Sequence, residues 1–124
     1  MKRLMLLIAA MLFCTVAVAQ STSADTATWS WTAPTTFVDG TAIPSTDAIT
    51  YNLYIGTSGA NSEGTTPAQA GMSALTVVTS GYTPGQVVCG QIAAVVNGME
   101  SARSNEACKT FPLVPSAPTA LKVQ

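Results

Sequence analysis

The feature that most constrains this 124-residue chain is residues 81–111, which predict a β-hairpin with one cysteine on each strand. A proline–glycine turn at residues 82–85 begins it, because proline presets φ at the second position of a turn and glycine tolerates the positive φ of a type II turn at the third. Residues 87–96 are short and rich in β-branched side chains, which favours a strand over a helix. Both alternating faces of this strand are mostly apolar, so we expect it to be central in a sheet.

The two cysteines of the hairpin are Cys89 and Cys108. Asn97-Gly98 is a strong hairpin signal, and a second strand is expected at residues 104–111. With the loop centred near Met99, the cysteines lie opposite each other to within a one-residue register adjustment. A cross-strand pair at that separation can form a disulfide. The sequence therefore predicts this bond, and two buried free thiols are the alternative.

Residues 1–19 have the organisation of a signal peptide: a basic start, a short apolar stretch and a small-residue cleavage site between Ala19 and Gln20. The apolar stretch is too short for a membrane-spanning helix. Lipid attachment at Cys14 is an alternative, but Phe13 stands where such a motif needs a small residue. We expect a secreted, periplasmic or extracellular protein with no membrane insertion after cleavage, in a compartment that favours the disulfide.

Charge and composition exclude several classes of function. Beyond residue 19 the chain has three basic and six acidic side chains, a net charge of −3. Without a basic patch, we expect no nucleic-acid partner and no electrostatic attraction to anionic membranes. The chain has no histidine, so it has no Ser–His or Cys–His pair and no imidazole metal ligand. Asp39 and Asp47 share a loop and could in principle act as an acid/base pair or bind calcium. Their spacing does not resemble an EF-hand, and carboxylates in a loop are solvated by default. We expect no catalytic residues, no cofactor and no metal.

Three more strands are predicted at residues 27–34, 49–55 and 73–79, with polar loops between them. The second loop, residues 56–71, has room for a short edge strand. Side-chain alternation assigns the core faces of these strands. The residues expected in the core are Trp29, Trp31, Tyr51, Leu53, Leu75, Val77, Tyr82 and Ile92. Short strands joined by turn-forming residues predict an all-β fold, a β-sandwich.

Several motifs agree in order and spacing with one family. They are residues 28–34, 49–58, 82–85, 94–98 and 100–106. Together they resemble a fibronectin type III domain of the bacterial or phage type, over residues 27–112. The resemblance implies an immunoglobulin-like β-sandwich, and a non-catalytic structural or interaction module that contacts proteins or cell surfaces. Tyr82 departs from the family, which usually has leucine there, and the absence of an Arg-Gly-Asp motif removes the integrin partner of some members.

The two ends of this region leave alternatives open. Residues 20–26 are polar and are expected to form a flexible N-terminal segment. The proline-spaced pattern that leads into the first strand of the family lies instead at residues 113–124. That segment is a truncated second domain, a disordered tail or a strand donated to its own domain or a neighbour. Donation would make the protein an assembly subunit that self-associates through these residues. A carbohydrate-binding accessory module is another alternative, with Tyr54 as its one candidate aromatic. The partner, a protein or a surface glycan, is not identified.

Overall fold

The computed structural model describes residues 25–124. The predicted signal peptide, its cleavage site and Cys14 lie outside the described residues. The described part is all-β, as predicted, and contains no helix that is long and apolar enough to cross a membrane. Its strands are β1 (Ala27–Ser30), β2 (Ile49–Gly56), β3 (Gln69–Met72), β4 (Thr76–Thr79), β5 (Val87–Val96), β6 (Met99–Glu100) and β7 (Ala107–Thr110).

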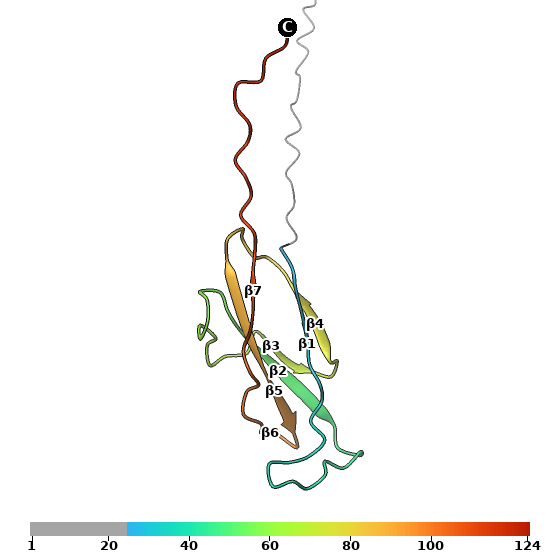
Figure 1. The fold of residues 1–124 in the computed structure, drawn as a ribbon. Coiled ribbons are helices and arrows are strands. Elements are labelled where there is room, and N and C mark those ends of the chain that lie inside the picture. Colours follow the sequence, from blue (N-terminus) through green and yellow to red (C-terminus); the bar gives the residue numbers. More distant parts are fainter. Residues whose placement is uncertain (1–24) are drawn as a thin grey trace, which may run out of the picture.

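The strands form two antiparallel sheets (Figure 1). One sheet consists of β1 and β4. The other has the order β3-β2-β5, with β6 and β7 both paired to the far side of β5. The predicted central position of β5 is confirmed, because β5 is paired along both of its edges. The short edge strand expected in the second loop is β3.

Both sheets contribute side chains to one hydrophobic core. Its buried residues are Ala27, Trp29, Leu53, Val88 and Phe111. Trp29 of β1 lies over Gly90 of β5, where the absence of a Cβ leaves room for the indole ring. The indole Nε1 of Trp29 donates a hydrogen bond of 2.8 Å to Thr79 Oγ1 on β4. The burial of Trp29 thus depends on a small residue below it and a polar partner beside it.

The two predicted turns have the geometry that their residues favour. The Thr83 carbonyl accepts a 3.1 Å hydrogen bond from the Gln86 amide, and Gly85 has a φ of 81°. This is the type II arrangement expected from Pro84 followed by glycine. In the hairpin, Asn97 and Gly98 have φ values of 52° and 78° and join the two strands directly. Two consecutive positive φ values match the type I′ turn that twists with its flanking strands.

The register of this hairpin differs from the expectation. The turn is centred between Asn97 and Gly98 rather than near Met99, and Val95 pairs with Glu100. Farther along, Cys89 pairs with Cys108, so the returning chain contains two more residues than β5 over the same span. The strand predicted at residues 104–111 is consequently shorter and starts at Ala107.

Serine hydroxyls hold the irregular stretch between β6 and β7 against β5. Ser101 Oγ accepts a 3.0 Å hydrogen bond from the Ala94 amide, and Ser104 Oγ accepts one of 3.1 Å from the Ile92 amide. These side chains take the place of backbone carbonyls in the ladder. The extra residues are therefore accommodated without leaving the amides of β5 unpaired.

The prediction that Leu75 lies in the core is wrong. Leu75 is 44% exposed, because β4 begins only at Thr76 and residues 73–75 cross from β3 in one sheet to β4 in the other. The Leu75 carbonyl accepts a hydrogen bond from the Trp31 amide, and this bond extends the pairing one residue beyond β1. Val77 packs against the core as expected.

Candidate interaction site

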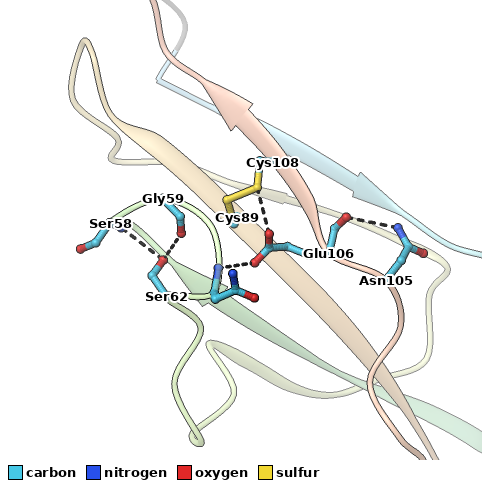
Figure 2. Close-up of a disulfide and its surroundings, with 8 residues drawn as sticks. Ser58, Gly59, Ser62, Cys89, Asn105, Glu106 and Cys108 are labelled. Atoms are coloured by element: carbon cyan, nitrogen blue, oxygen red, sulfur yellow. Dashed lines mark hydrogen bonds between the residues drawn. A yellow bond between two sulfur atoms is a disulfide. The ribbon is translucent and has the colours of Figure 1, made fainter.

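The predicted disulfide is present between Cys89 and Cys108 (Figure 2). Direct opposition on β5 and β7 brings the two Cα atoms to 4.0 Å, close to the spacing of a non-hydrogen-bonded antiparallel pair. The Glu106 carboxylate lies 3.5 Å from Cys108 Sγ and accepts a 2.6 Å hydrogen bond from the Asn61 amide. The hairpin is thereby tied to the loop between β2 and β3. Because both sulfurs are bonded to each other, neither is a thiolate ligand for a metal.

The other residues singled out from the sequence lie in or against the core. Trp29, Tyr51 and Leu53 are buried. The rings of Trp31 and Tyr51 are 5.4 Å apart between centroids, and those of Tyr82 and Phe111 are 5.0 Å apart. Trp31, Tyr82 and Ile92 are partly buried and pack against the core. Sequence reasoning did not identify Phe111 as a core residue, although it closes a predicted strand and is only 2% exposed.

Tyr54, the candidate for sugar stacking, offers no free ring face. The Arg103 guanidinium lies over the ring, with Cζ 3.6 Å from the centroid, and the side chain is only 5% exposed. The phenol donates a 2.5 Å hydrogen bond to Glu100 Oε1. Ionisation of the phenol would break this hydrogen bond, so the bond to Glu100 raises the pKa of Tyr54. The cluster of Arg103, Tyr54 and Glu100 orders the outer face of the larger sheet, and Arg103 covers the ring surface on which a sugar would stack.

The loop carboxylates each have a separate local role. Asp39 Oδ1 accepts hydrogen bonds from the amide and the hydroxyl of Thr41, and the hydroxyl bond contributes most to lowering the pKa of Asp39. Asp47 Oδ2 accepts a 2.9 Å hydrogen bond from the Asn97 side chain. Asp39 thus stabilises a turn within the loop, and Asp47 attaches the loop to the hairpin turn.

The β1–β2 loop and the β5–β6 turn lie at the same end of the domain (Figure 1). An apolar groove of about 250 Å³ lies between side chains of these segments. We call five of its apolar lining residues, Phe37, Val38, Ile43, Val96 and Met99, the loop-pole surface. Val38 is fully exposed and Met99 is 76% exposed. Sequence reasoning missed this surface. Its signal is the apolar pair that precedes Asp39-Gly40 in a segment otherwise expected to be polar.

The loop that carries this surface is itself folded. Thr36 and Ala42 form an isolated antiparallel bridge, and the Phe37 amide donates a 2.8 Å hydrogen bond to the Thr41 carbonyl. The Gly40 amide donates to the Phe37 carbonyl at 3.0 Å. These bonds make a miniature hairpin, and the exposed apolar side chains are held on a defined backbone.

No protein-family model matches the sequence, and no curated protein matches it.

Proposed function

We propose that this protein is an exported, non-catalytic interaction module with a fibronectin type III-like β-sandwich, and that it binds another protein through the loop-pole surface. Two antiparallel sheets around a core that contains Trp29 support the fold proposal. Such folds host many functions, so the function has to come from a surface rather than from the fold.

The single observation that supports binding most directly is the exposure of three side chains of the loop-pole surface, Phe37, Val38 and Met99. Contiguous exposed apolar side chains on a soluble domain commonly mark a binding site. Here Val38 and Met99 project from two different segments that converge on one groove. Because the hydrogen bonds of the miniature hairpin already fix the Val38 backbone, little ordering entropy is lost on binding.

The acidic side chains near the groove indicate which kind of partner surface would bind there. Asp39 lies in the miniature hairpin, and Glu100 lines the groove. Glu100 already accepts the hydrogen bond from the Tyr54 phenol, and two basic side chains of the described chain have their own contacts, Arg103 over the Tyr54 ring and Lys109 with the Thr26 carbonyl. A partner that inserts an apolar side chain and surrounds it with basic residues would complement this surface.

Export has two separate supports. The first 19 residues have the organisation of a signal peptide, and the Cys89–Cys108 bond persists most readily in an oxidising compartment. We therefore place the partner on the outer side of the cytoplasmic membrane.

Site-specific photocrosslinking tests the binding proposal. A photoreactive side chain is introduced at Val38, and at Val78 on β4 as a matched apolar control that is 60% exposed. Each variant is incubated with the envelope and extracellular proteins of the source organism. We expect a discrete protein adduct from position 38 and none from position 78, with a lower yield in Met99→Ser and at high salt. Equal labelling from both positions, or no adduct from position 38, would refute the proposal.

A further inference from the structure

The outer edge of β1 is unpaired within residues 25–124. The Trp31 amide donates to the Leu75 carbonyl, and the β1–β4 register places the backbone groups of Trp29 on that same side. Because pairing alternates along an antiparallel strand, the amides and carbonyls of Thr28 and Ser30 point away from β4. Neither residue makes a backbone hydrogen bond on that outer side in the described chain. Such an edge is a template for an added strand.

A groove of about 360 Å³ lies beside this edge. The β1 side of the groove is formed by residues 29–32, and the opposite side includes Ser104 and Ala107. Leu53 and Ile92 supply apolar lining between them. Trp31 also lines the groove, and its buried indole Nε1 has no hydrogen-bond partner among the described residues. The site combines free backbone groups with apolar lining, and an extended strand with one apolar face provides for both.

Residues 119–124 have the pattern of such a strand. Leu121 and Val123 are 100% and 98% exposed, and alternation would place both on one face of a strand. No proline interrupts these six residues, so every amide can donate. At about 3.3 Å per residue they span ~20 Å, which matches residues 27–32 of the acceptor edge. Ala120 has a φ of 58° and would move to the extended region that alanine favours.

The position of this segment favours an acceptor in a second molecule. The tail leaves the domain after Phe111, near the start of β1, where Lys109 Nζ contacts the Thr26 carbonyl at 2.6 Å. Its prolines at 112, 115 and 118 favour a stiff extended conformation of about 3.1 Å per residue. Figure 1 shows the tail running away from the strands. Reaching its own groove would require a reversal within the proline-spaced part.

We propose that residues 119–124 of one copy of this chain add to the free edge of β1 in a second copy, with Leu121 and Val123 in the groove. The two surfaces differ, so the contact is heterologous, and each added copy presents a further free tail and a further free edge. The association does not use the loop-pole surface. A protein that does not self-associate would therefore leave the proposed function standing, and a protein that binds no partner through the loop-pole surface would leave the association standing.

Light scattering coupled to size-exclusion chromatography over a concentration series tests this association. We expect wild-type protein to form a concentration-dependent series of oligomers. The double variant Leu121→Asp/Val123→Asp should be monomeric. A matched control, Ala120→Asp/Gln124→Asp, adds the same charge on the opposite face of the strand and should associate as the wild type does. A monomeric wild type at every concentration, or equal effects of the two double variants, would overturn the proposal.

A mixing experiment tests the head-to-tail arrangement. Ser30→Pro removes one outward amide of β1 while its tail stays intact, and circular dichroism checks that it is folded. If it is unfolded, Thr28→Pro replaces it. This edge variant is then mixed with Leu121→Asp/Val123→Asp, which has an intact edge but no functional tail. The tail of the edge variant can add to that intact edge, and no further copy can then be added. We expect dimers and no larger species. Larger oligomers in the mixture, or monomers only, would refute the arrangement.

Tryptophan fluorescence tests whether the tail instead occupies the groove of its own molecule. A monomeric wild type whose tryptophan fluorescence changes with Leu121→Asp would show that it does, which also overturns the proposal.

Discussion

Replacing Gly90 by alanine tests whether the core depends on the close approach of Trp29 to β5. A Cβ at this position would lie 2.7 Å from Cζ3 and 2.9 Å from Cη2 of the indole. Carbon atoms prefer about 3.5–4.0 Å, so the ring would have to retreat by roughly 1 Å. The ring cannot bend, and its Nε1 is held by Thr79.

The expected loss of stability is the sum of two destabilising contributions and one stabilising contribution. Overpacking a well-filled core costs about 1–3 kcal/mol. Displacing the ring weakens the hydrogen bond to Thr79, which contributes about 1 kcal/mol. Alanine also restricts the unfolded chain, which offsets about 0.4–1 kcal/mol of the loss. We expect Gly90→Ala to lower the free energy of unfolding by about 2 kcal/mol.

Urea unfolding followed by fluorescence and circular dichroism measures this loss. Gly64→Ala is the matched control, because the nearest atom to its added Cβ is the Thr66 amide nitrogen at 4.0 Å and its stability should change little. In a Trp29→Leu background the clashing ring is absent, so Gly90→Ala should be nearly neutral there. An equal loss in both backgrounds would refute the reasoning, because it would place the cost outside the Trp29–Gly90 contact.

Two further predictions concern the hairpin and the outer face of the larger sheet. The double variant Cys89→Ala/Cys108→Ala should lose about 3 kcal/mol of stability by the chain-entropy account for a sequence separation of 19. Urea unfolding measures the loss, and a change well under 1 kcal/mol would show that the turn and the serine contacts already close the hairpin. The Tyr54 phenol should ionise above its usual value near 10, and Glu100→Gln should lower the midpoint in a phenolate absorbance titration. The pKa of Tyr54 is higher in the folded than in the unfolded protein. The contribution of the Tyr54–Glu100 hydrogen bond to the free energy of unfolding is therefore complete below about pH 10, and it is lost as the pH rises through the folded-state pKa. A midpoint unchanged by Glu100→Gln would contradict the assignment.

Local sequence signals predicted the two turns and the first strand of the hairpin correctly, because the responsible interactions are short-range. Pro84-Gly85 and Asn97-Gly98 adopt the φ values that their residue types favour, whatever the rest of the fold does. The bounds of β5, Val87–Val96, follow from a β-branched run enclosed by these two turns. Its partner strand was placed less well, because no residue between β6 and β7 signals the two additional residues in the register.

The candidate site was the least predictable part. Val38 and Met99 are 61 positions apart in the chain, and only the packing of a folded loop against the β5–β6 turn brings them to one groove. Similarly, alternation indicated that Tyr54 faces outward, but it gave no sign that Arg103 would cover the ring. Side-chain contacts between distant segments depend on register and sheet pairing, which the period of a single strand does not contain.

The sequence by itself determined the all-β class, the two turns, the central strand and the pairing of Cys89 with Cys108, since each depends on local backbone preference or on one short hairpin. Only the tertiary structure decided that Leu75 is exposed, that Gly90 lies beneath Trp29 and that the outer edge of β1 is free in the described chain. The reason is physical: turn and strand preferences act over a few residues, whereas burial and edge pairing depend on which distant strands become neighbours.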